Sequence, residues 1–178
     1  ILAATAGPMV ERYVNHAKTL KARSEVKVIG SVIQLLMNDL GHEGLPSGPD
    51  SDTWLELLVS EGDVPEIPEG EGGTWALETT TEQAGLFNDF LLTNAPGFVV
   101  KGGGSRAFGW DGPYLQTAVG SDPWGNRYMA NIGVMSLGRE YVPVIVSAGA
   151  DGIIDTPFLV EWDELGERLG DDIYQVCR

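Results

Sequence analysis

The feature that most constrains the fold is a run of apolar residues spaced three and four positions apart. Its members are Val26, Ile29, Val32, Ile33, Leu36, Met37 and Leu40, and this spacing predicts an α-helix with one buried face. Gly41 follows and supplies a helix stop. The preceding stretch, VERYVNHAKTLKARSE, contains neither glycine nor proline, so we expect a single helix from Ile1 to Leu40, about 60 Å long. Because only its second half carries the apolar stripe, the first half is expected to project as a stalk.

The first ten residues, ILAATAGPMV, carry no charge and include Pro8. A proline within a helix removes the hydrogen bond to the carbonyl four residues earlier, here that of Ala4, and its ring crowds the preceding turn. Such a defect is tolerated better inside a packed bundle or a membrane than in water. The stretch therefore suits an apolar environment.

The rest of the chain reads as loops followed by strands. Acidic loops rich in glycine and proline flank one short helix expected around Thr53 to Ser60, and a second is expected within residues 79–94. After Pro123, short β-branched and aromatic runs predict strands, and the run containing Pro143 is expected at a sheet edge. The pattern predicts an α+β fold with the helix packed on a C-terminal antiparallel sheet. We expect a helix over residues 1–41 and a head over 42–178, with loops at 42–108 and the sheet at 109–178.

Charge and cysteine content exclude several classes of protein. A chain of 178 residues supports one domain. Its net charge of −15 disfavours nucleic acid and favours divalent cations. The single cysteine, Cys177, excludes an internal disulfide, and we expect its thiol to be buried or at a frayed end. No run of about 20 apolar residues is present that could span a membrane.

Enzyme chemistry finds little support in the sequence. Ser147 lacks the G-x-S-x-G context of a hydrolase nucleophile, and the two histidines, His16 and His42, fall on the stalk helix and just after it. Two isolated histidines make a zinc site unexpected. The glycine-rich stretches KGGGSRAFG and GEGGTW match no phosphate-binding pattern. The five tryptophans, at positions 54, 75, 110, 124 and 162, are expected to anchor loops on the sheet.

A tight turn is predicted at DPWG. Asp122 and Pro123 suit the first two positions of a type I turn and Gly125 suits its last. Trp124 is then expected to anchor the loop, and the turn to have a structural role.

Four motifs in a fixed order carry a family resemblance. They are GWDGPYL (109–115), DPWGNRY (122–128), SAGADG (147–152) and GDDI (170–173). Together they resemble the major pseudopilin of bacterial type II secretion systems, within the type IV pilin-like family. The fragments TTTEQAGL (79–86) and ILAATAGP (1–8) are similar to family segments as well.

The resemblance implies a filament subunit. It implies that membrane-embedded apolar residues precede Ile1, that the subunit resides in the bacterial inner membrane before assembly, and that it forms a periplasmic or extracellular filament afterwards. The implied partners are further copies of the chain, minor pseudopilins and an inner-membrane assembly machine. A surface type IV pilus fibre and a soluble ligand-binding module with its site on loops 42–104 remain alternatives.

Calcium is the cofactor expected from the acidic residues. Calcium takes six to eight oxygen ligands, and a flexible glycine-rich loop can wrap around it. In the resembled pseudopilins the ion lies between the loop after the ADG turn and a later aspartate pair, which implies Asp151, Asp171 and Asp172 here, with Asp155 as a further ligand. This chain inserts TPFLVEWDELGERL between the two parts. The alternative is that these aspartates only cap turns and solvate the surface.

Overall fold

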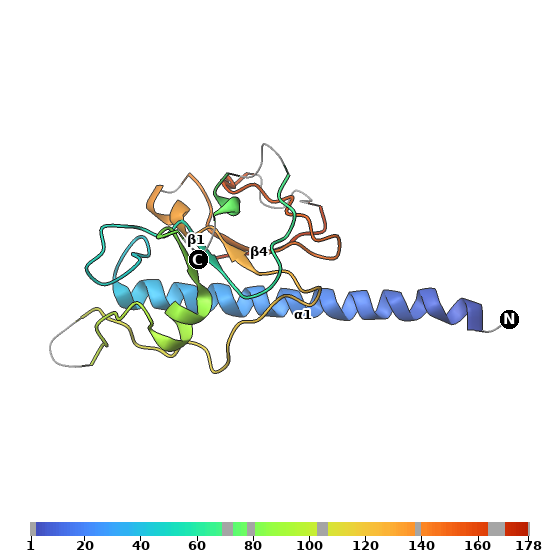
Figure 1. Cartoon of the computed structure of the whole chain (residues 1–178), viewed down its shortest axis with the longest axis horizontal. Helices are drawn as coiled ribbons and strands as arrows, with labels where there is room; N and C mark the ends of the chain where they lie inside the picture. The colour runs from blue at the N-terminus through green and yellow to red at the C-terminus, as the bar shows by residue number, and fades with distance from the viewer. Residues whose placement is uncertain are drawn as a thin grey trace.

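One long helix organises the molecule. The computed structural model describes residues 3–68, 73–77, 81–102, 107–137, 140–163 and 170–177. Helix α1 (Ala3–Leu40) is continuous through position 8, and its N-terminal half extends well beyond the head (Figure 1). It ends at Gly41, which has a left-handed φ of 70° and donates a hydrogen bond from its N–H to the Met37 carbonyl. The predicted single helix with a projecting stalk is confirmed.

Burial along α1 changes abruptly at the point where the head begins. Every side chain from Met9 to Ala17 is exposed. Beyond Lys21 one face is buried, formed by Ala22, Val26, Ile29, Val32, Ile33, Leu36, Met37 and Leu40. The predicted stripe is therefore the buried one, and it starts one turn earlier, at Ala22.

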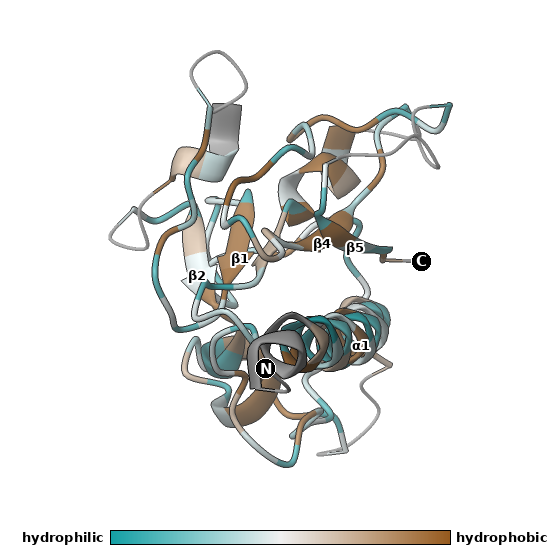
Figure 2. Cartoon of the chain, turned by 90° about the vertical axis from the view of Figure 1, so that its right-hand side faces the viewer, coloured by the Kyte–Doolittle hydropathy of each residue, from teal (hydrophilic) through white to brown (hydrophobic). Residues whose placement is uncertain are grey.

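A five-stranded sheet packs against this face of α1. The strands are β1 (Leu57–Val59), β2 (Ala84–Leu86), β3 (Met129–Ala130), β4 (Val144–Ser147) and β5 (Ile173–Val176), in the order β2-β1-β3-β4-β5. This is the α+β arrangement expected from the sequence. Figure 2, viewed along α1, shows the helix and the sheet as separate layers.

The sheet is mixed, which differs from the antiparallel sheet that we expected. Strands β3, β4 and β5 pair antiparallel, as does β1 with β3, but β2 runs parallel to β1. A parallel pair needs a long crossover connection, and residues 60–83 provide it. Strands β1 and β2 lie in the part of the chain where loops and two short helices were expected.

The helix expected at Thr53 to Ser60 is wrong, because β1 occupies this segment. All three residues of β1 are buried, since α1 covers one sheet face and loops cover the other. A strand buried on both faces has no polar alternation and resembles a buried helix in sequence. The second short helix, predicted within residues 79–94, is confirmed only in part. Strand β2 occupies the first part of this segment, and the π-helix η2 (Asp89–Thr93) follows it.

Pro143 does not mark an edge strand. It directly precedes β4, which lies between β3 and β5. Its missing N–H costs no ladder hydrogen bond at that position, while its carbonyl accepts one from the Cys177 N–H at 2.8 Å.

Two apolar cores lie on the two faces of the sheet. Leu58, Ala130 and Ile145 face α1, while their strand neighbours Leu57, Val59, Met129, Val144 and Val146 belong to a second core. That second core also includes Trp75, whose indole N–H donates to the Thr156 carbonyl at 2.9 Å. Trp75 and Trp110 are thus buried anchors as expected, whereas Trp54 and Trp162 are exposed, contrary to expectation.

Candidate functional site

The stalk exposes an apolar face that its own head does not cover. Its large exposed side chains are Met9, Val10, Tyr13, Val14 and Leu20, and Val28 and Leu35 continue them along α1. At about 100° per residue these seven fall within an arc of about 140°. The side chains buried against the sheet project from roughly the opposite side of the helix. We call the exposed set the outer face of α1.

An exposed apolar face of this extent is typical of an interaction site. Tyr13 is 66% exposed and Leu20 is 51% exposed, so water covers most of both side chains. Within the described residues, no helix combines the length and the hydropathy that a membrane span requires.

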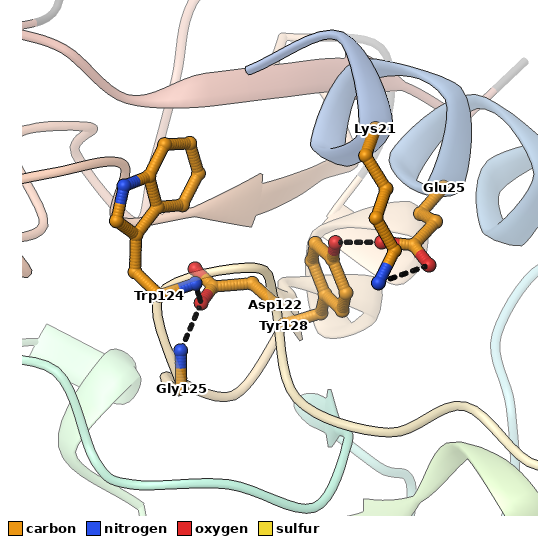
Figure 3. A network of polar contacts seen from close by, with 6 residues as sticks. All are labelled: Lys21, Glu25, Asp122, Trp124, Gly125 and Tyr128. Atoms are coloured by element: carbon orange, nitrogen blue, oxygen red, sulfur yellow. Dashed lines mark hydrogen bonds and ion pairs between the residues drawn. The ribbon is translucent and has the colours of Figure 1, made fainter. Parts of the chain in front are cut away.

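The DPWG turn fixes α1 at the point where the stalk leaves the head (Figure 3). The Tyr128 hydroxyl donates to Glu25 Oε2 at 2.6 Å, and Lys21 Nζ lies 3.7 Å from Glu25 Oε1. Lys18 Nζ lies 5.9 Å from the centroid of the Trp124 ring. Burial, and next the hydrogen bond to Glu25, raise the pKa of Tyr128, so its hydroxyl stays protonated as a donor.

Asp122 holds the turn itself in shape. Its buried carboxylate accepts hydrogen bonds through Oδ1 from the N–H groups of Trp124, Gly125 and Asn126, each at 2.9 Å. Oδ2 accepts from the Ser147 hydroxyl at 2.6 Å. The Gly125 N–H also donates to the Asp122 carbonyl at 3.0 Å, which confirms the predicted four-residue turn. Ser147 is fully buried, so its hydroxyl serves this anchor.

The GWDGPYL motif fixes the other end of α1. Lys101 Nζ lies 2.7 Å from Asp39 Oδ1, and the Tyr114 hydroxyl donates to Asp39 Oδ2 at 3.0 Å. Burial raises the pKa of Tyr114 to about 12. The Trp110 indole N–H donates to the Phe90 carbonyl at 2.9 Å. Sequence reasoning missed both attachments of α1, since each joins residues more than 60 positions apart in the chain.

The structure brings the four predicted calcium ligands together as two neighbouring pairs. Asp171 Oδ2 accepts hydrogen bonds from the N–H groups of Ala150 at 2.7 Å and Asp151 at 3.3 Å. Asp172 Oδ2 accepts from the N–H groups of Asp155 at 2.9 Å and Thr156 at 2.7 Å. The residues inserted after Asp155 therefore do not separate the loop that contains Asp151 and Asp155 from the segment that contains Asp171 and Asp172.

Electrostatics in this cluster disfavour negative charge. Burial raises the pKa of Asp171, and the neighbouring Asp151 carboxyl raises it further. Burial, with a smaller contribution from the charge of Asp155, raises the pKa of Asp172 to about 7. Asp172 Oδ1 is buried and has no hydrogen-bond partner among the described residues.

Carboxylate oxygens are the ligands that calcium prefers, and Asp172 Oδ1 has no hydrogen-bond partner among the described residues, so the groups present are of the type that this ion binds. Within the described part of the chain, no three side chains of histidine, cysteine, aspartate or glutamate converge on one point. Main-chain carbonyls or water would have to complete the coordination shell.

Other residues singled out in the sequence lie apart from this cluster. His16 is exposed on the stalk and His42 lies in the loop after α1, both as expected, and Cys177 is buried. Within the two glycine-rich stretches, residues 70–72 and 103–106 lie outside the described residues, as do residues 164–169 of the insertion.

Comparison with known families gives one match. Residues 97–157 match the family model of the type II secretion system (T2SS), protein G. The match covers about a third of the chain and includes three of the four motifs. The resemblance to the major pseudopilin is confirmed over these residues. No curated protein and no solved structure matches.

Proposed function

We propose that this protein is a structural subunit of a type II secretion pseudopilus, assembling helically through its N-terminal helix. The observation that carries the proposal is the outer face of α1: Met9, Tyr13 and Leu20 are apolar, exposed and turned away from the head. Packing against other copies would remove this surface from water. The match to the protein G family supports the secretion system as the setting.

The geometry suits addition of subunits in one direction. A contact that joins different surfaces on two copies does not close and generates a helical polymer. The attachments at Glu25 and Asp39 hold α1 at two points along the head, so a force applied to the stalk reaches the head without a hinge at either place. The partners in this function are further copies, minor pseudopilins and the inner-membrane assembly machinery.

Fibre formation tests the proposal. The full-length chain is expressed with its secretion machinery, and sheared fractions are examined by electron microscopy and immunolabelling. Fibres of this subunit are expected. Leu20→Glu is expected to abolish them because it places a charge on the outer face. The control Asn15→Glu adds the same charge to an exposed position away from the outer face, and fibres are expected to persist. A wild-type chain that remains strictly monomeric would contradict the proposal.

We further propose that calcium binds the cluster of Asp151, Asp155, Asp171 and Asp172. The buried, unpartnered Oδ1 of Asp172 supports this, as do the hydrogen bonds that Asp171 and Asp172 accept from the main chain of Asp151 and Asp155. A bound cation would supply positive charge that no side chain of the cluster provides. It would tie loop 148–155 to loop 170–172 and so order this part of the head.

Thermal unfolding of metal-stripped protein tests the calcium site. Calcium is expected to raise the melting temperature, because a ligand that binds only the folded state stabilises it. Asp151→Asn and Asp155→Asn are expected to remove most of that rise. Asp163→Asn, a control at another exposed aspartate, should retain it. Calorimetry that detects no calcium binding to the wild-type chain would exclude the site.

A further inference from the structure

A groove on the head has no role in the contacts described so far. It has a volume of about 540 Å³, and its lining residues include Asp52, Trp54, Glu56, Ser136, Leu137 and Leu159. Trp54 is 44% exposed and Leu137 is 58% exposed, so large apolar side chains face solvent here. We call it the Trp54 groove.

The groove is acidic as well as apolar. Asp52 and Glu56 line it, and Glu82 lies next to it, where Thr53 Oγ1 donates to Glu82 Oε2 at 3.4 Å. None of the described residues that line it is basic. Residues 28–100 contain thirteen aspartates and glutamates and not one lysine or arginine. The chemistry fits an apolar segment that carries positive charge.

The chain itself contains such a segment. Five of its eleven lysines and arginines lie between positions 12 and 27 of α1. In the stalk, His16 lies about 20° and Arg12 about 60° outside the arc of the outer face, on the side of Met9, at about 100° per residue. One side of the stalk is therefore apolar and basic together.

We propose that the Trp54 groove binds the stalk of a second copy of this chain, through residues 9–21. The proposal rests on the proposed function and adds to it the surface of the head that receives the stalk. Arg12 pairs with Asp52 at the rim, and the side chains of Met9 and Tyr13 pack against Trp54 and Leu137. The remainder of the outer face stays available for packing between helices.

The arrangement of the molecule allows this contact to repeat. The segment after α1 and the 3-10 helix η3 (Ile132–Leu137), which both contribute to the groove, lie over the C-terminal end of α1, at the opposite end of the molecule from the stalk tip (Figure 1). To bring its stalk to the groove, a second copy would have to be displaced along α1 toward that end. The two surfaces differ, so the contact leaves a free stalk and a free groove at the ends and propagates.

A charge exchange in the full-length chain tests the pairing. Arg12→Glu and Asp52→Arg are each expected to reduce the yield of sheared fibres about tenfold, because each replaces an attraction by a repulsion. The double variant restores the attraction with its sign reversed and is expected to recover most of the yield. Glu61→Arg, at an exposed acidic residue outside the groove, makes the same change of charge and should have little effect.

Disulfide trapping locates the contact directly. A chain with both His16→Cys and Ser136→Cys is expected to form a ladder of cross-linked copies on oxidation, since both positions are exposed. Cys177 is buried and can remain. His16→Cys combined with Gln116→Cys, an exposed position in the segment that runs on the other side of α1 from the sheet, should give no ladder.

The outcomes separate the two proposals. Wild-type fibres without a ladder, and without recovery in the double variant, would overturn the role of the groove and leave the filament function standing. Cross-linking of Ser136→Cys to a different polypeptide would also overturn it, because the occupant would then not be a second copy. Absence of wild-type fibres would reject the filament function and this inference with it.

Discussion

At the scale of single residues, Asp122 is the centre of the DPWG turn. One buried carboxylate satisfies three N–H groups and the Ser147 hydroxyl, and the turn positions Tyr128 and Trp124 against α1. The turn preferences of Asp122, Pro123 and Gly125 predicted the tight turn from the local sequence. The hydrogen bond to Ser147 was not predictable, because Ser147 lies 25 positions away and nothing local links the two residues.

Replacing Asp122 tests its importance for stability. Asp122→Ala leaves the buried Ser147 hydroxyl and the part-buried N–H groups of Trp124 and Asn126 without this acceptor, which we expect to cost about 3 kcal/mol of unfolding free energy. Asp122→Asn retains one carbonyl oxygen for the three N–H groups and should cost about half as much. Urea denaturation followed by tryptophan fluorescence measures both values. Equal losses for the two variants would show that the acceptor at Oδ1 is not what stabilises the turn.

At the scale of elements, α1 and β1 show what sequence can and cannot predict. The helix was predictable because its apolar spacing is local and its stop is a glycine. Strand β1 was missed because burial on both faces removes the alternation that identifies a strand. The four aspartates were identified as acidic pairs beside glycine-rich backbone and by a family resemblance. The structure shows that the two pairs are neighbours, and metal binding stays a prediction. The Trp54 groove was not predictable, since segments far apart in sequence form it.

Substitutions at Ile33 and Leu35, which lie on opposite sides of α1, test which face of the helix is buried. Ile33 is fully buried, so Ile33→Ala is expected to cost about 3 kcal/mol of unfolding free energy through lost burial and a residual cavity. Leu35 is 53% exposed on the outer face, and Leu35→Ala should change stability by less than about 0.5 kcal/mol. Chemical denaturation of the isolated protein measures both. A comparable loss at Leu35 would mean that the outer face is covered within a single chain.

At the scale of the whole molecule, the chain divides into a basic stalk, for which we propose a role in assembly, and an acidic head. Side chains from Met9 to Ala17 are exposed, so the head's core does not depend on them. A chain that begins at Lys18 is therefore expected to fold with a free energy of unfolding within about 1 kcal/mol of the full chain. It should sediment as a monomer and fail to enter fibres. Incorporation of this truncated chain into fibres would show that assembly does not require the stalk.

The central claim is that copies of this chain assemble through α1, and a helical reconstruction of its fibres by electron cryo-microscopy tests it most directly. The account predicts that α1 helices of neighbouring copies pack at the fibre axis, with Val10, Val14 and Leu20 between them and the heads outside. Fibres in which these three side chains remain in solvent would contradict the account.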